Sequence, residues 1–131
     1  MDRKRFIVEL GTGADLHGMD VTKAARRAVR DAISRSCLCG IIEILERDRF
    51  QGLTVDVLIA CPFPERVDIE AVKTEIPVGV PSVRVVAGGM QASGICVEAF
   101  ATACDTIVVA NAAVTLWVEM TPEKVDTPER Q

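Results

Sequence analysis

The residues best suited to chemistry in this 131-residue chain lie in one short segment, GTGADLHG at positions 11–18. It holds His17, the only histidine of the chain, two positions after Asp15. In an extended segment, residues at this spacing lie on one side, where a carboxylate can orient an imidazole and raise its basicity. The pattern predicts an acid–base site in which His17 transfers the proton, Asp15 orients it and Lys23 is an electrostatic contact.

The glycines around these residues predict a ligand-binding loop. Gly11, Gly13 and Gly18 permit unusual φ angles and a close approach of the backbone to a ligand. Asp20 is a suitable N-cap for a helix that begins directly after it. Because the free N–H groups at a helix N-terminus favour anions, segment 11–23 is predicted to bind a small polar or anionic metabolite.

Two other interpretations of this segment stay open. The loop could be purely structural, with Asp15 and Asp20 accepting hydrogen bonds from backbone amides and His17 packed against its neighbours. The same three side chains could also hold a divalent cation, although a single histidine does not match the usual zinc ligand sets. No dinucleotide fingerprint or P-loop is present, so we expect no cofactor beyond that alternative cation at Asp15 and His17.

A second turn of small residues, AGGMQASG at 87–94, offers further ligand contacts. Gly88, Gly89 and Ser93 could form a nest of backbone amides for an oxyanion, or they could only allow tight packing. The Gly-x-Ser-x-Gly elbow of α/β-hydrolases does not occur here.

The five cysteines are expected to be reduced, because the N-terminus lacks the features of a secretory signal. Cys96 and Cys104 lie in apolar surroundings and are predicted to be core thiols. Cys61 follows a predicted strand, and only His17 could activate it as a nucleophile.

Hydrophobic periodicity predicts the elements that position these residues. We expect strands over 5–10, 53–62 and 81–87 and within 105–120, the last interrupted near Asn111, and helices over 21–36 and 67–76. Segments 37–50 and 90–104 are not assigned. The first helix has an alanine-rich apolar stripe that would let it lie close to a sheet. The fold class is α+β: one domain over 1–120, a two-layer sandwich with a mixed sheet and helices on one face, and a loose polar tail over 121–131.

Composition restricts the partners. The net charge of −4 and the sequence pI of about 5.0 argue against nucleic-acid binding. No apolar run reaches the roughly 20 residues of a membrane span, so no membrane partner is expected and the protein is predicted to be cytoplasmic.

The apolar content of the strands exceeds what two short helices can cover. The residues concerned are Leu58, Ala60, Val109, Val114, Leu116 and Trp117. An exposed apolar patch usually marks an interface, so we expect a homo-oligomer; a sheet that folds back on itself is the alternative.

The run FIVELGTGADLHGMDVTKAARRAV resembles the signature of a small uncharacterised family marked by Gly-x-Gly-x-Asp-x-His-Gly. Those positions are Gly11, Gly13, Asp15, His17 and Gly18 here. NAAVTLWV resembles the last strand of that family, so the resemblance spans residues 5–120. It implies a site in this loop and assigns no activity.

A more distant similarity is to single domains of cyanuric acid hydrolases and barbiturases, which open cyclic amides with three related domains around one site. It implies a homotrimer with sites between subunits and an amidohydrolase-like reaction. Alanine stands at position 87, before Gly88 and Gly89, where those enzymes have the serine of a Ser-Gly-Gly segment. The alternative function is a non-enzymatic ligand-sensing or assembly module with a structural loop.

Overall fold

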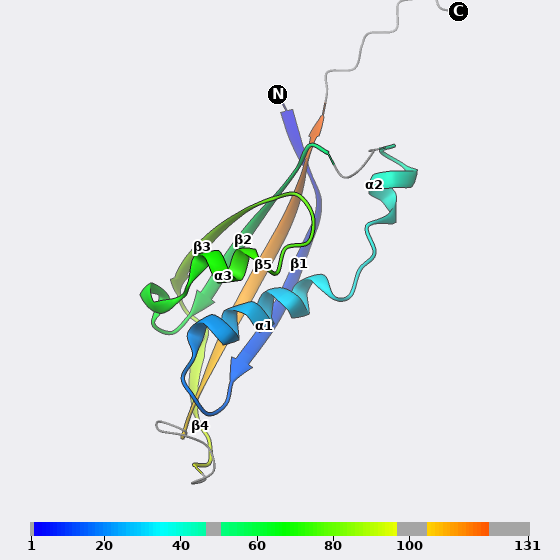
Figure 1. Ribbon diagram of the computed structural model, residues 1–131. Coiled ribbons are helices and arrows are strands. Elements are labelled where there is room, and N and C mark those ends of the chain that lie inside the picture. The colour runs from blue at the N-terminus through cyan, green and yellow to red at the C-terminus, as the bar shows by residue number, and fades with distance from the viewer. Residues whose placement is uncertain (1, 47–50, 97–104, 121–131) are drawn as a thin grey trace, which may run out of the picture.

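The computed structural model describes residues 2–46, 51–96 and 105–120. These residues form a mixed sheet with helices on one face (Figure 1). In chain order the elements are β1 (Asp2–Asp15), α1 (Val21–Ile33), α2 (Cys39–Glu43), β2 (Leu53–Cys61), η1 (Pro64–Arg66), α3 (Ile69–Lys73), β3 (Val80–Ala87), β4 (Met90–Ser93) and β5 (Thr106–Met120). The predicted α+β class with helices on one face is confirmed. The predicted tail over 121–131 lies outside the described residues.

Strand β5 is the axis of the sheet, whose order is β1-β5-β2-β3. It pairs antiparallel with β1 along one side. On its other side it pairs antiparallel with β2 as far as Ala60 opposite Asn111, and then with β4 from Met90 opposite Val109. Only β2 and β3 are parallel among the described pairs. Strand β4 therefore continues the sheet at the point where β2 leaves it.

Helix α1 packs unusually close to β1 because small residues face each other. Its buried residues are Val21, Ala24, Ala25, Ala28, Val29 and Ala32. A Cβ added to Gly13 would overlap the backbone of Ala24 and Ala28, and one added to Gly11 would overlap the backbone of Ala28 and Ala32. The alanine stripe thus lies on the sheet as predicted, and the two glycines allow the contact.

Strict alternation separates the two faces of the sheet. Residues Val55, Val57, Ile59, Val114, Leu116 and Val118 are buried beneath the helices. Their neighbours point the other way and are mostly half-buried, and we call that side the open face; it includes Val8, Leu10, Leu58, Val109 and Trp117. Two members of the predicted surplus, Val114 and Leu116, therefore belong to the covered face.

The predicted end of the first strand at position 10 is wrong. Strand β1 continues to Asp15, because backbone pairing with β5 runs without a gap from Ile7 to Asp15. The predicted interruption of the last strand is also wrong. Asn111 is exposed on the open face, where water can solvate its polar side chain, and β5 runs through it.

The structure assigns parts of segments 37–50 and 90–104, which the sequence left open. A short helix, α2, occupies the ambiguous apolar run, and β4 follows the turn at Gly88 and Gly89. Residues 47–50 and 97–104 lie outside the described part. Across the described residues, none of the helices is both long and apolar enough to cross a bilayer.

Candidate functional site

Asp15 ends β1 and holds the turn that leads into α1. Its side chain is 8% exposed. Its Oδ2 accepts hydrogen bonds from the amides of Gly18, at 3.2 Å, and Asp20, at 2.9 Å. These contacts fold residues 16–20 back over the end of the strand, as the structural interpretation of the loop requires.

Two cations of α1 face the other oxygen of Asp15. Lys23 Nζ lies 3.8 Å and Arg27 Nη1 3.9 Å from Oδ1. Arg27 also donates a 2.7 Å hydrogen bond to the carbonyl of Ala14. The negative charge of the buried carboxylate is thereby balanced by side chains one and two turns into the helix.

His17 lies in the same turn, half-buried, between Asp15 and Gly18. The structure therefore places the predicted histidine in the turn that the predicted carboxylate holds. Both oxygens of Asp15 nevertheless have partners in amides and cations. Its role as the orienting partner of His17 stays a prediction.

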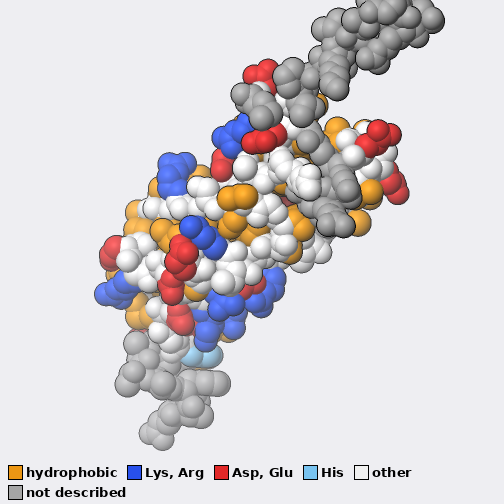
Figure 2. Space-filling model, turned by 45° about the horizontal axis from the view of Figure 1, so that its top comes forward, with side chains coloured by type: hydrophobic (Ala, Val, Ile, Leu, Met, Phe, Trp, Pro, Cys, Tyr) orange, Lys and Arg blue, Asp and Glu red, His pale blue; other side chains and the backbone are white. Residues whose placement is uncertain are grey.

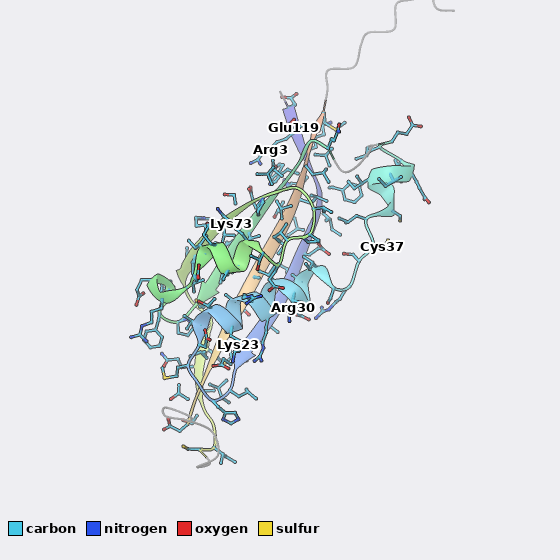
Figure 3. The ribbon with its side chains drawn as sticks, viewed as in Figure 1. Arg3, Lys23, Arg30, Cys37, Lys73 and Glu119 are labelled. Atoms are coloured by element: carbon cyan, nitrogen blue, oxygen red, sulfur yellow. The ribbon has the colours of Figure 1, made fainter. Side chains whose placement is uncertain are left out.

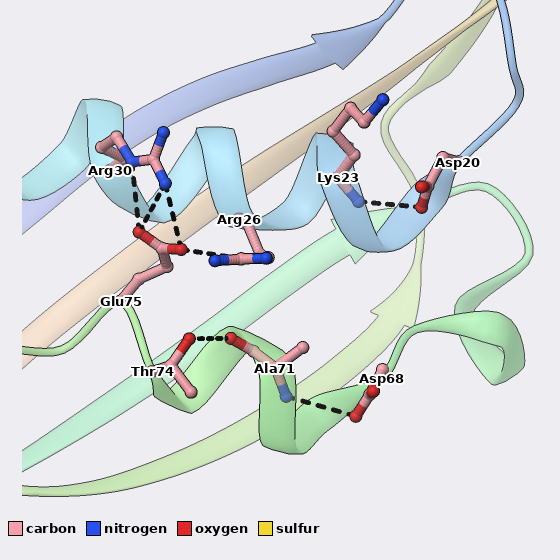
Figure 4. Close-up of polar contacts among 8 residues, drawn as sticks. All are labelled: Asp20, Lys23, Arg26, Arg30, Asp68, Ala71, Thr74 and Glu75. Atoms are coloured by element: carbon pink, nitrogen blue, oxygen red, sulfur yellow. Dashed lines mark hydrogen bonds and ion pairs between the residues drawn. The ribbon is translucent and has the colours of Figure 1, made fainter.

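Asp20 caps α1 as predicted, with Oδ1 accepting a 3.0 Å hydrogen bond from the amide of Lys23 (Figure 4). Free amides at a helix start attract anions. Here the carboxylates of Asp15 and Asp20 already occupy part of that position. The N-terminus of α1 therefore has its own anionic partners.

Glu75, which follows α3, pairs with two arginines of α1 (Figure 4). Its carboxylate accepts from Arg26 Nε at 2.7 Å and from Arg30 Nη2 at 3.0 Å. Burial alone raises the pKa of Glu75, but the hydrogen bonds from both arginines outweigh it and hold the pKa below the usual 4.5. Sequence reasoning did not identify Glu75, because it lies 45 residues from Arg30 along the chain.

A shallow depression of about 250 Å³ follows the basic side of α1. Figure 2 shows Lys and Arg side chains gathered on the lower part of the molecule, and Figure 3 shows Lys23 and Arg30 on this helix. The lining residues of the depression are Asp20, Thr22, Lys23, Arg26, Arg27 and Arg30. The second small-residue turn does not line it. Lys23, the predicted electrostatic contact, is exposed along this depression.

Gly88 and Gly89 serve the chain path between β3 and β4. The Gly88 amide donates to the carbonyl of Cys61 at 3.2 Å. Gly89 has φ +65°, and a Cβ there would overlap the carbonyl of Val109. At Gly88 and Gly89, where a nest of amides was predicted, the backbone packs closely against β2 and β5. This geometry agrees with the alternative that the glycines allow tight packing.

The register places this turn and the loop at one end of the sheet. Val108 of β5 pairs with Asp15 on one side and with Gln91 of β4 on the other. Two strand spacings, about 9–10 Å, therefore separate the backbones of those two strands. Ser93 lies two residues farther along β4, opposite Thr106.

The environments of Cys61 and Cys96 differ from those predicted. Cys61 is fully buried; burial raises the pKa of its thiol and the Glu65 carboxylate raises it further, the opposite of an activated nucleophile. Cys96 is exposed and disulfide-bonded rather than a core thiol, because it follows β4 beyond the covered core. Cys104 lies outside the described residues. Within the described ranges, no group of three His, Cys, Asp or Glu side chains is placed to hold a metal ion.

Comparison with known proteins gives a family and a fold neighbour. A search of curated protein sequences found no significant match. A crystal structure of an FtsZ-like protein of unknown function from Nostoc punctiforme PCC 73102 is similar, with 38% sequence identity and a TM-score of 0.82. The alignment covers 92% of this chain and 99% of that chain. The model of a conserved hypothetical protein family, Lin0512, matches residues 5–116. The chain belongs to the Lin0512 family.

Proposed function

We propose that this protein works as a homo-oligomer whose subunits associate through the open face of the sheet, while the loop at 16–20 is structural. The observation that carries the proposal is the uncovered face itself. Helices α1 and α3 pack on the opposite side (Figure 1). The open face presents Leu10 at 69% exposure on β1 and Val80 at 68% on β3, and Val8 of β1 is also exposed.

The side chains on the open face near the start of β1 support binding of a protein partner. Trp117 Nε1 is buried and has no acceptor among the described residues. The Arg3 guanidinium stacks 4.1 Å above the indole centroid and lies 3.5 Å from Asp56. Tryptophan and arginine are the side chains most enriched at the energetic centres of interfaces.

A second copy of the chain fits this surface better than an unrelated partner. The face carries charges of both signs, with Arg3, Arg5 and Arg84 beside Asp56 and Glu119, so two copies can pair opposite charges. Strands β1, β2, β3 and β5 have 14, 9, 8 and 15 residues. At about 3.3 Å per residue and about 4.8 Å between strands, they span about 700 Å², close to the roughly 800 Å² per partner of a stable interface. A trimer is the size that we expect.

The test is the mass of the protein in solution, measured by light scattering for the wild type and for Leu10→Glu. We expect an oligomer for the wild type and a folded monomer for the variant, because the new charge would be buried without a partner. Ile44→Glu is the matched control, since Ile44 is 78% exposed on the C-cap of α2 and away from the open face. A monomeric wild type, or equal masses for wild type and Leu10→Glu, would contradict the proposal.

A second candidate function is binding of a small polar or anionic metabolite at segment 11–23, with His17 as acid–base group in amide or cyclic-amide hydrolysis. The basic depression along α1 favours it, because Lys23, Arg26, Arg27 and Arg30 all line it. Gly18 and the second turn, Gly88, Gly89 and Ser93, would be its further ligand contacts.

A thermal-shift series with phosphate, citrate and cyanuric acid tests this candidate. His17→Ala is expected to abolish the stabilisation by the bound compound and to leave the melting temperature without it nearly unchanged. If His17→Ala instead lowers the melting temperature and no compound stabilises the wild type, the loop has only a structural role.

A further inference from the structure

A pocket on the covered face of the sheet lies apart from both surfaces considered above. It has a volume of about 220 Å³, room for about seven water molecules at ~30 Å³ each. Its walls include Ile33, Leu38, Ile76 and Leu116, and its polar groups include Glu9 and Ser36. The end of α1 and the segment after α3 border it, so it is built from parts of the chain that are distant in sequence.

Glu9 is an acidic residue in a pocket with mainly aliphatic walls. It occupies a position of β1 opposite Val114, on the side of the sheet that the helices cover, and it is half-buried. Acidic side chains lie mostly on exposed surfaces rather than on the covered side of a sheet. Its carboxylate accepts a hydrogen bond from Ser36 Oγ. No lysine or arginine of the described residues forms an ion pair with it.

The charge of Glu9 indicates which kind of ligand the pocket would bind. A carboxylate beside apolar walls is stabilised by a neighbouring cation or by further hydrogen-bond donors. Ser36 supplies one donor, and the other described walls are mainly aliphatic. An anion would meet the charge of Glu9 with no cation in the lining to balance it. A compact apolar molecule with an ammonium group fits both the shape and the charge.

We propose that this pocket is a binding site for a small primary amine, with the alkyl part against Ile33, Leu38 and Ile76 and the ammonium group on the Glu9 carboxylate. The charge preference is the reverse of that at the basic depression along α1. The site also lies on the opposite side of the sheet from the open face, so it does not depend on oligomer formation.

The experiment uses n-butylammonium as probe and butyrate as a probe of similar size and opposite charge. Binding is followed by the NMR shifts of methyl groups in the full chain. We expect n-butylammonium to give saturable shifts at Leu38 and Ile76 and butyrate to give none. Glu9→Gln keeps the shape and the contact with Ser36 while removing the charge, and it should weaken amine binding about ten- to hundredfold, as expected for a hydrogen bond to a charged group.

Glu70→Gln is the matched control, because Glu70 lies on the exposed side of α3 and pairs with Lys73. It should leave amine binding unchanged. Equal binding of butyrate and n-butylammonium by the wild type overturns the proposal without recourse to any variant. So does an amine affinity that Glu9→Gln does not change, or the absence of saturable shifts with the amine.

Discussion

Asp15 is the residue on which the connection between sheet and first helix depends. Its carboxylate receives two amides of the turn on one oxygen and faces Lys23 and Arg27 with the other. A buried acceptor of this kind cannot be removed without leaving donors unsatisfied. Its fixed environment also means that any chemistry at His17 would take place beside a carboxylate whose hydrogen bonds are already made.

Asp15→Ala is therefore expected to destabilise the fold by about 2–3 kcal/mol, because the amides of Gly18 and Asp20 lose a charged acceptor. Urea denaturation followed by circular dichroism measures this difference. Asp2→Ala removes an exposed carboxylate at the other end of β1 and should change the stability by less than about 0.5 kcal/mol. A similar loss in both variants would show that Asp15 does not hold the turn.

At the scale of elements, the contact between β1 and α1 is a backbone-to-backbone packing. Gly11 and Gly13 lie directly under the alanine stripe of the helix. Because no side chain separates the two elements at these positions, a single methyl group has no space to occupy. This explains the glycines of the segment by packing rather than by ligand binding.

Gly13→Ala is expected to cost about 3 kcal/mol or more, since the new methyl group would overlap the backbone of Ala24 and Ala28 and force the helix away. Gly40→Ala is the control, because its Cβ would approach only side-chain atoms of Phe6 and Ile44 and alanine favours a helix by about 1 kcal/mol. The denaturation midpoints of the two variants measure this difference in stability. Equal small effects would mean that α1 can shift freely on β1.

The pairing of Glu75 with Arg26 and Arg30 joins α1 to the segment after α3 and makes stability depend on pH. Because the pKa of Glu75 is lower in the folded state than the usual 4.5, its stabilisation is full above that value and is lost as the pH falls through the folded-state pKa. Glu75→Gln should therefore be less stable than the wild type at pH 7, and the difference should shrink towards pH 3.

Denaturation curves at a series of pH values measure this convergence. Glu70→Gln is the control, because its pair with Lys73 is exposed and should contribute at most about 0.5 kcal/mol at any pH. A gap between wild type and Glu75→Gln that stays constant down to pH 3 would contradict the assignment.

For the whole molecule, the two faces of the sheet differ in what covers them. One is closed by helices that belong to the same chain, and the other presents Leu10, Val80 and the Trp117–Arg3 stack. If copies of the chain close the open face, folding and association are coupled. Stability then becomes a property of the assembly.

The melting temperature of the wild type should therefore rise by several degrees when its concentration is raised about a hundredfold, whereas that of Leu10→Glu should not change. Calorimetry at a series of concentrations gives this result directly. A wild-type melting temperature that is independent of concentration would indicate that the open face stays uncovered.

Local signals in the sequence determined several elements correctly. Alternation of apolar residues identified β2, and Asp20 with the alanine stripe identified the start and buried side of α1. These features depend on residues a few positions apart, so periodicity and capping reveal them. The α+β class with helices on one face followed from the order of those elements.

Only the tertiary structure decided the roles of Gly13, Glu75 and Glu9. Gly13 stayed within β1 because β5 pairs with it from about a hundred residues away, and the α1 backbone passes close above it. Glu75 lies 45 residues from Arg30, and the walls around Glu9 come from α1, β5 and the segment after α3. Residue types and spacing do not encode such long-range contacts, because the path of the chain through the sheet sets them.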